Sequence, residues 1–599
     1  MCGIAGVFDL TGSIDPKSFL DEILERMKSR GPDDAGTLCT HNWAIGMRRL
    51  SIVDLEKGAQ PQANETEDVL VLHNGEIYNH EGLKRQLEAK GHRFSTRSDT
   101  EVLVHGYEEW GMEGMLARIE GMFALAIVDR KKDQLHLARD RFGEKPLYLH
   151  AKPKGFSFSS DLKTLVQTLG IRNEIDPLSL RRYLALHYIP GNRSIIKGVE
   201  RLLPGERAVA SLADLKIRKH RYYDGIPSNK EDFDPEHLRS LLEQAISGRL
   251  MGEVPVGIFL SGGLDSSLVT ALASRNTSNL KTFSIGFDSA NHDESIHASR
   301  MAEKCNVPHK LIKFGEKDFR KLLPVVAKAL DEPLGDPAAL PTYRLCQEAK
   351  ESVKIILSGE GADEIFAGYS YYQPFQNKSG WLQRFLGKGS KGKPSGLLNP
   401  LTLQTPSGFP LVSGKEEWSN LAKIAPEAET DAWENDFLST LEEVGDPLRQ
   451  ATLSDTLTWL PDNLLVKLDR ITMSNSLEGR SPFLMQSLVE YGHNLPSDSK
   501  IKRGEVKHAL RVASSKWLPA ENLSRQKQGF VLPMASWLQN YVADFGGPAE
   551  YVSQRQCEYL DEERLVHLLE RRLQTPKGNE RILFSLILFL EWWIHLDEN

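Results

Sequence analysis

The amino-acid sequence predicts two domains of different class: an α+β layered domain, followed by an α/β domain built on a parallel sheet. A chain of 599 residues exceeds the size at which one hydrophobic core keeps growing. The first 150 residues carry short strand-like runs between Gly, Asn and Asp turn signals. From about residue 234, apolar runs of strand length alternate with long helix-period segments, the pattern of a parallel sheet with covering helices. We therefore expect domains at residues 1–210 and 234–599.

The strands and helices expected in the first domain follow from the spacing of its apolar residues and from its turn-forming residues. Runs at residues 69–73 and 122–128 have the length and composition of strands. Helical patterns lie at residues 15–30 and 100–110. Residues 203–227 are interpreted as closing strands and a linker to the second domain.

The second domain is expected to begin with strands at residues 254–260, 282–287 and 354–357. Residues 376–396 are rich in Gly, Ser and Lys and indicate a mobile loop or an insertion. After residue 445 the pattern is mainly helical, and no internal repeat is found.

Composition excludes several classes of protein. The 74 basic and 82 acidic residues give a formal charge of −8, which does not favour a nucleic-acid partner. The start, MCGIAGVF, has no basic leader and is not interpreted as a signal peptide. The apolar run at residues 582–590 is far shorter than the roughly 20 residues of a membrane helix, so we expect a buried helix and no membrane partner.

The cysteines favour a reducing cytoplasm. They are odd in number, widely scattered and without a CxxC pair, which argues against both a disulfide framework and a zinc site. The five are Cys2, Cys39, Cys305, Cys346 and Cys557.

Cys2 is the first candidate for catalysis. Removal of Met1 would place a thiol and a free α-amino group on one residue, and an amine with a pKa near ~8 can serve as the thiol's own general base. A structural cysteine at position 2 is the plain alternative.

The same domain supplies groups suited to glutamine. Arg49 in RRLSIVD can bind a carboxylate with two hydrogen bonds, and Asp99 in RSDTE can pair with an ammonium group. Asn74 and Gly75 in HNGEIYN offer a side-chain amide and a backbone N–H for an oxyanion. Each has an ordinary interpretation too, because Asn-Gly is a common hairpin turn and Arg or Asp is common on a surface.

Together, the segments CGIAG, RGPD, RRLSIVD, NGEIYN, SDTE, GMFALAIVD and RDRFGEKPLYL resemble the glutaminase domain of the N-terminal-nucleophile amidotransferases. The resemblance covers the first third of the chain. It implies a four-layer αββα fold of the N-terminal-nucleophile hydrolase type, Cys2 as nucleophile, and a pocket shaped in part by Arg30. The glutamine-binding residues that it implies are Arg49, Leu50, Ser51, Ile52, Val53, Asn74, Gly75, Glu76 and Asp99.

A glycine-rich loop follows the first strand of the second domain. The apolar run at residues 254–260 leads into SGGLDSS and then into an apolar helical segment. Backbone N–H groups and a helix N-terminus in that order make an anion cradle. The loop lacks the Gly-Lys-Ser/Thr ending of a P-loop, so transfer of the γ-phosphate is not the natural inference. The residues of this predicted phosphate-binding loop, the candidates to bind ATP, are Ser261, Gly262, Gly263, Asp265 and Ser266.

A second loop, SGEGADEIFAGY, follows the strand that ends at residue 357. Its acidic residues would repel a phosphate unless a metal lies between them. Asp265 and Asp363 are the candidates to hold Mg²⁺ against pyrophosphate oxygens.

Both loops resemble the pyrophosphatase-type nucleotide-binding domain of the asparagine synthetases. The resemblance continues through DESIHA, DEPLGDPAALPTY, LLVKLDR, SLEGRSPFL and RQKQGFVLP. It implies cleavage of ATP between the α and β phosphates, an acyl-adenylate, and attack by ammonia from glutamine. By motif, Leu260 and Ile285 border the adenosine, and Ser358 and Gly359 touch the nucleotide. Glu360 governs the β-aspartyl-AMP step, and Lys467 neutralises charge as pyrophosphate leaves.

Two departures from the family pattern concern the acceptor. Met485 stands where the family usually has an aspartate, and the 376–396 loop has no counterpart. The favoured hypothesis is conversion of aspartate to asparagine, with glutamine, ATP and Mg²⁺ as partners and a homodimer as the family's habit. Alternatives left open are the same chemistry on another carboxylic acid, in a cell-surface polysaccharide or secondary-metabolite pathway, a β-lactam-synthetase-like cyclase, and a glutamine-sensing protein without turnover.

Overall fold

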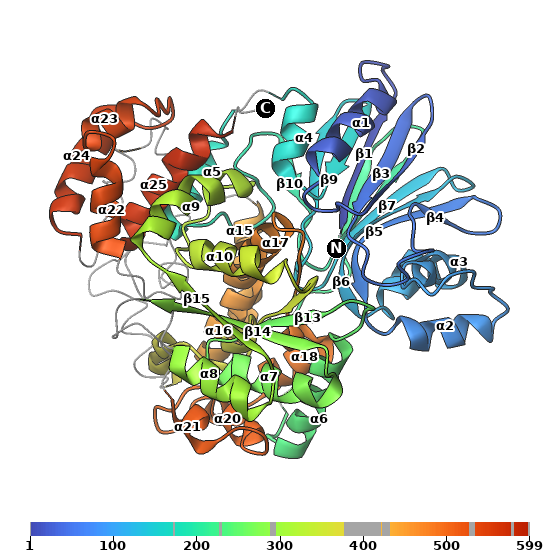
Figure 1. Cartoon of the computed structure of the whole chain (residues 1–599). Coiled ribbons are helices and arrows are strands. Elements are labelled where there is room, and N and C mark those ends of the chain that lie inside the picture. The colour runs from blue at the N-terminus through green and yellow to red at the C-terminus, as the bar shows by residue number, and fades with distance from the viewer. Residues whose placement is uncertain are drawn as a thin grey trace.

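The computed structural model describes residues 2–171, 174–226, 231–287, 295–376, 421, 432–525, 534–576 and 580–596. The antiparallel sheets of the N-terminal part lie on one side of the molecule and the parallel sheet of the C-terminal part on the other (Figure 1). The expected 376–396 loop lies outside the described residues from residue 377 onward. Residues 526–533, which belong to the RQKQGFVLP segment, also lie outside them.

The N-terminal part contains two six-stranded antiparallel sheets packed face to face. The first has the order β10-β8-β9-β1-β3-β2 and the second β12-β11-β7-β6-β5-β4. Strands of the first sheet are β1 (Cys2–Asp9), β2 (Asp34–Cys39), β3 (Trp43–Arg49), β8 (Tyr148–Lys152), β9 (Gly155–Ser159) and β10 (Val199–Arg201). Strands of the second are β4 (Gln62–Ala63), β5 (Val69–Ile77), β6 (Gly121–Asp129), β7 (Gln134–Arg139), β11 (Glu206–Ser211) and β12 (Ile217–Arg221).

Helices cover both outer faces of this sandwich. The helices are α1 (Pro16–Arg26), α2 (His80–Glu88), α3 (Glu101–Leu116), α4 (Leu162–Thr168) and α5 (Pro177–Leu186). Helices α1 and α4 flank the first sheet, and α2 and α3 flank the second (Figure 1). Along β5, Leu70 and Leu72 face the other sheet while Val69 and Val71 face α2 and α3, as the two-residue period of a strand requires. The predicted αββα architecture is therefore confirmed.

Local sequence explains where the helices begin. Asp15 accepts a hydrogen bond from the backbone N–H of Ser18, with Pro16 at the first helical position of α1. The predicted helix at residues 100–110 is α3, which continues past a break at Gly111, where φ is 67°. The strands expected at residues 203–227 are β11 and β12, so the second sheet extends to Arg221.

The C-terminal part is built on a five-stranded parallel sheet, which confirms the predicted α/β class. Its order is β15-β14-β13-β16-β17. The strands are β13 (Val256–Phe259), β14 (Leu280–Phe287), β15 (His309–Phe314), β16 (Ile355–Leu357) and β17 (Glu478–Arg480). The carboxyl ends of β13 and of its neighbours β14 and β16 meet at one edge, where ligands bind in open parallel sheets.

Helices cover both faces of the parallel sheet, with α7 and α8 on one face and α9 and α10 on the other (Figure 1). Helices that precede residue 377 are α6 (Pro235–Gly248), α7 (Leu264–Asn276), α8 (Ser295–Lys304), α9 (Glu316–Ala329), α10 (Ala339–Ala349), α11 (Ala362–Phe366) and η1 (Ser370–Gln376). Those from residue 432 to residue 494 are α15 (Ala432–Glu443), α16 (Pro447–Leu457), η2 (Leu460–Leu465), α17 (Val466–Met473), η3 (Pro482–Leu484) and α18 (Gln486–Asn494). The remainder are α19 (Ser497–Lys500), α20 (His508–Ser514), α21 (Ala520–Ser524), α22 (Met534–Ala543), α23 (Pro548–Ser553), α24 (Glu562–Gln574) and α25 (Glu580–Ile594).

The apolar run at residues 582–590 lies in α25 and is buried, as predicted. Among the residues that the structure describes, no helix combines the length and the apolar character needed to span a membrane.

Two candidate active sites

Cys2 opens β1 at the centre of the first sheet and is buried. Its backbone N–H donates to Asn74 Oδ1 at 3.0 Å, and Asn74 Nδ2 donates to Ser160 Oγ at 3.1 Å. These bonds join the two sheets and fix the orientation of the Asn74 amide. Burial raises the pKa of the Cys2 thiol, so the sulfur is protonated near neutral pH and requires a base before it can act as a nucleophile.

Gly75 stands next to Asn74, where β5 passes β6 closely. A Cβ atom at position 75 would lie 1.9 Å from the backbone oxygen of Met122. Any side chain here would force β5 and β6 apart, which explains why the turn-prone residue lies inside a strand instead of in the hairpin that Asn-Gly often signals.

Arg49 pairs with Cys2 across β3 and β1. Its Nη2 donates to the backbone oxygens of Val53 and Asp54, both at 2.9 Å, so residues 50–54 turn around the guanidinium. Leu50 and Ile52 are buried beneath this turn, and the backbone N–H of Ser51 donates to Asp33 Oδ2.

Asp99 and Glu76 complete the predicted pocket. Asp99 Oδ2 accepts from the backbone N–H of Ile77 at 2.8 Å, which places it beside β5. Glu76 is buried 3.7 Å from Arg480, and burial together with the nearby Glu478 carboxylate raises its pKa well above the usual range. The residues expected to bind glutamine therefore lie together around the start of β1, on β3, β5 and the turns that follow them.

The first nucleotide loop lies between β13 and α7. Ser261 N–H donates to Ser266 Oγ, and Gly263 N–H donates to Ser261 Oγ, so the loop closes on itself before the helix begins. Gly262 has a φ of 74°, and a Cβ atom there would lie 2.6 Å from the backbone nitrogen of Ala298. Leu260 is buried and bonds to the backbone of β14, the strand that carries Ile285.

The second loop follows β16 and touches the first. Ser358 N–H donates to the backbone oxygen of Arg480, and Glu360 N–H lies 3.4 Å from Ser358 Oγ. A Cβ atom on Gly359 would lie 3.0 Å from Cβ of Asp265, so the two loops are in contact. The structure thus brings together the loops that were expected to bind ATP.

Lys507, which sequence reasoning missed, bridges the two predicted metal ligands. Its Nζ lies 2.6 Å from Asp265 Oδ2 and 2.7 Å from Asp363 Oδ1. Although burial opposes the charge, these carboxylates raise the pKa of Lys507. No local signal marks this lysine, because its role depends on a contact across 242 residues with Asp265.

Lys467 lies at the start of α17, 2.8 Å from Asp336 Oδ2 and 3.7 Å from Glu360 Oε1. Burial opposes its charge, but the two carboxylates raise its pKa, so Lys467 is a permanent cation. The pairing with Glu360 joins two residues that were predicted separately, whereas Asp336 was quoted in a motif without a role.

Helix α17 also contacts the glutaminase-like part. Asp469 accepts from Arg30 at 2.9 Å, and Arg30 Nε lies 3.3 Å from the Cys2 backbone oxygen. Arg470 donates to the backbone oxygen of Ser160, whose hydroxyl holds Asn74. One short helix therefore connects the surroundings of Cys2 with those of Glu360.

Comparison with known proteins finds relatives of both parts of the chain. Residues 237–595 match the family model described as asparagine synthase, and residues 1–223 match that of the glutamine amidotransferase domain. The chain is 31% identical over 612 residues to asparagine synthetase (glutamine-hydrolyzing) 1 of Bacillus subtilis, covering 99% of this chain and 96% of that one. It is 33% identical over 635 residues to a putative asparagine synthetase (glutamine-hydrolyzing) of Mycobacterium bovis, covering 99% and 97%.

A solved structure, the glutamine phosphoribosylpyrophosphate amidotransferase of Bacillus subtilis, matches with 16% identity and a TM-score of 0.30, over 60% of this chain and 82% of that one. A likeness of this size adds nothing to the fold described above.

Proposed function

Because the chain belongs to the asparagine synthase family and carries that family's N-terminal glutamine amidotransferase domain, we propose that it is a glutamine-dependent asparagine synthetase. It converts aspartate, ATP and glutamine to asparagine, AMP, pyrophosphate and glutamate. The observation that carries this proposal is that one chain holds Cys2 hydrogen-bonded to the Asn74 amide and two touching glycine-rich loops beside buried lysines, joined through α17.

In the glutaminase half, the Cys2 sulfur attacks the side-chain carbonyl carbon of glutamine after its α-amine takes the thiol proton. Asn74 Nδ2 and the Gly75 N–H stabilise the oxyanion. Arg49 binds the α-carboxylate, and Asp99 pairs with the α-ammonium. The carbon–nitrogen bond breaks as the α-amine passes that proton to the leaving nitrogen, which departs as ammonia. Water then hydrolyses the thioester to glutamate and the free Cys2 thiol.

In the synthetase half, a carboxylate oxygen of aspartate attacks the α-phosphate of ATP and pyrophosphate leaves. Backbone N–H groups of the first loop, at the N-terminus of α7, bind phosphate oxygens. Lys507 and Lys467 offset the negative charge of the departing pyrophosphate. Ammonia then attacks the acyl carbon of the adenylate, and AMP leaves.

The residues at the loops also fit a magnesium ion. Asp265 and Asp363 share one cation, and Asp265 Oδ1 is buried and makes no hydrogen bond within the described part of the chain. Two carboxylates beside a phosphate cradle suit a hard divalent ion that also takes phosphate and water ligands. Mg²⁺ held by Asp265 and Asp363 would neutralise phosphate oxygens, and Lys507 would then turn toward the nucleotide.

Transfer of ammonia between the halves is part of the proposal, because a neutral ammonia molecule in solution would become protonated and lost. Its support is the buried contact of α17 with both sites, through Asp469 and Arg470 on one side and Lys467 on the other. We place the protein in the cytoplasm. We expect a homodimer because members of this family usually form one.

A different acceptor acid is the second candidate, since Met485 departs from the family pattern. Met485 stands at the N-cap of α18, with its side chain buried. An aspartate at that position would be a favoured helix cap, whereas Met leaves the first turn without one. Met485 in place of aspartate therefore changes the capping of a helix, and this weakens the argument that the acceptor is an acid other than aspartate.

The test is to incubate the purified protein with ATP, Mg²⁺, glutamine and aspartate and to quantify asparagine, glutamate, AMP and ADP. Asparagine formed in step with AMP supports the proposal. Glutamate release without asparagine or AMP contradicts aspartate as the acceptor and calls for a panel of other carboxylic acids under the same conditions.

A further inference from the structure

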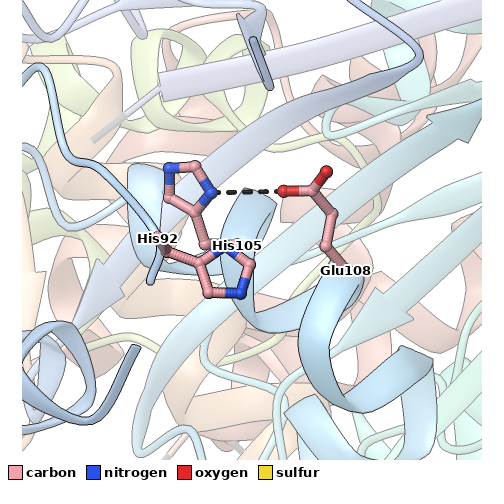
Figure 2. Close-up of side chains that lie close together, drawn as sticks. All are labelled: His92, His105 and Glu108. Atoms are coloured by element: carbon pink, nitrogen blue, oxygen red, sulfur yellow. Dashed lines mark hydrogen bonds and ion pairs between the residues drawn. The ribbon is translucent and has the colours of Figure 1, made fainter. Parts of the chain in front are cut away.

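We propose that His92, His105 and Glu108 form a binding site for a transition-metal ion of the zinc class on the glutaminase-like part of the chain (Figure 2). One ligand atom from each residue lies within 4.8 Å of the others. His105 and Glu108 stand one turn apart on α3, and His92 belongs to the segment that joins α2 to α3. The scattered cysteines argue against a zinc site, but that prediction does not extend to a group that contains no cysteine.

The separation between His105 and Glu108 suits a small ion. His105 Nδ1 lies 3.2 Å from Glu108 Oε2, close to the ~3.4 Å that separates two ligand atoms in a tetrahedral zinc site. Glu108 Oε1 accepts from Asn64 Nδ2 at 2.7 Å, so the carboxylate is fixed with its other oxygen toward His105. The rings of His92 and His105 lie with centroids 5.0 Å apart.

Outer carboxylates stand behind both imidazoles. Glu101 Oε1 lies 3.8 Å from His105 Nε2, and Glu109 Oε2 lies 3.3 Å from His92 Nε2. A carboxylate behind the second ring nitrogen is the usual partner of a metal-binding histidine, because it fixes the tautomer and makes the ligand more basic. This arrangement would leave Nδ1 of each ring to the ion.

The donor set selects the class of ion. Two imidazole nitrogens and one carboxylate oxygen suit zinc and its neighbours, whereas Ca²⁺ and Mg²⁺ prefer oxygen alone. Glu101 and Glu108 lie within 4 Å of His105, and Glu109 lies within 4 Å of His92 and 2.5 Å from Lys90 Nζ. Glu108 is exposed and His92 partly exposed, so the ion can enter and water can complete its coordination.

A bound ion would tie His92 to α3 and so stabilise the segment that leads to Asp99. Glu101 already holds this segment by accepting from the backbone N–H groups of Ser95 and Thr96. Loss of the ion would loosen only the part of the segment nearest His92.

The experiment uses the full-length protein, stripped of metal and kept in excess Mg²⁺. Zn²⁺ binding is measured by calorimetry, and Co²⁺ is used as a spectroscopic probe for a tetrahedral site. The parent is expected to bind one more Zn²⁺ than His92→Gln or Glu108→Gln. If a variant still binds that ion, its dissociation constant for Zn²⁺ should be at least about tenfold higher than that of the parent. His41→Gln, at an exposed histidine in the turn before β3, is the matched control and should bind as the parent does.

Thermal unfolding supplies an independent measurement. Zn²⁺ should raise the melting temperature of the parent and of His41→Gln, and leave that of His92→Gln unchanged. Equal zinc binding by the parent and His92→Gln would overturn the proposal. Equal stabilisation by Ca²⁺ would show that the carboxylates alone hold the cation, and would overturn the assignment to the zinc class.

Discussion

The Arg30 guanidinium and the Asp469 carboxylate form an ion pair of 2.9 Å that is almost fully buried, with side chains 4% and 2% exposed. Arg470 Nη1 lies 3.7 Å and Lys145 Nζ 3.9 Å from the same carboxylate, so one acid faces three cations. Although burial opposes ionisation, these neighbours lower the pKa of Asp469. The two parts of the chain are therefore joined by a charge cluster without access to water.

Replacement of Asp469 by Asn should lower the free energy of unfolding by about 3–5 kcal/mol, because it leaves buried cations without a counter-charge. Urea unfolding measures the change. Lys354→Met is the control, since Lys354 and Asp33 also pair between the two parts, at 2.8 Å, but are 38% and 31% exposed. It should cost less than about 1 kcal/mol. A similar loss in both variants would contradict the importance of burial.

Replacement of Cys2 by Ala should abolish glutamine-dependent synthesis and leave synthesis from added ammonium salts intact, because only the nucleophile is removed. We expect glutaminase activity to fall at least about a thousandfold, in the range found when a catalytic group is lost. Cys39→Ala, at an exposed cysteine, should behave as the parent. Loss of ammonia-dependent synthesis in Cys2→Ala would argue against separate sites.

Replacement of Lys507 by Met should reduce AMP formation by about a hundredfold or more while glutaminase activity persists, because two carboxylates lose their buried cation and the nucleotide loses a positive charge. Aspartate-dependent release of pyrophosphate measures the effect. Lys502, exposed and five residues earlier, provides the control variant Lys502→Met. An unchanged rate in Lys507→Met would remove this lysine from the proposed mechanism.

The segment before Asp99 should be sensitive to acid through Glu101. Burial opposes its ionisation, but His105 and the Ser95 and Thr96 donors lower its pKa to about 2. A lowered carboxyl pKa stabilises the fold above the unfolded-state value of 4.5, and that stability is lost as the pH falls toward 2.

Glu101→Gln should therefore lower the free energy of unfolding by about 1–3 kcal/mol at pH 6, and the difference from the parent should shrink below pH 4.5. Glu88→Gln, at an exposed position on α2, should show no such difference. A constant gap from pH 6 to pH 3 would contradict the assignment of the low pKa to Glu101.

Strands such as β6 and β14 could be predicted because they are apolar and of ordinary length. Strand β17 could not. Its three residues, Glu478, Gly479 and Arg480, are completely buried, yet two of them are charged and hydropathy gives no hint of a strand. They are accommodated because Arg480 Nε donates to Glu478 at 2.6 Å and Arg480 also faces Glu76. Such a strand depends on partners that are distant in sequence.

The residues of the candidate sites likewise fall into those that local sequence predicts and those that depend on distant contacts. The glycine loops could be predicted from local sequence because tight turns require particular residues. Cys2 and Asn74 could be predicted because each lies in a short motif whose residue types suit glutamine chemistry. Lys507, Asp336 and the pair of Arg30 with Asp469 gain their roles from contacts over more than a hundred residues. The group of His92, His105 and Glu108 is intermediate, because two members share a helix turn and the third comes from a loop.

The charge cluster at Asp469 also affects the order in which the protein is made. Asp469 leaves the ribosome 439 residues after Arg30, a delay of roughly 20 to 90 s at ordinary rates of synthesis. During that interval the N-terminal sandwich can fold, but Arg30 and Lys145 face water instead of an acid. A nascent chain stalled in this interval would present a basic surface that the finished protein does not have.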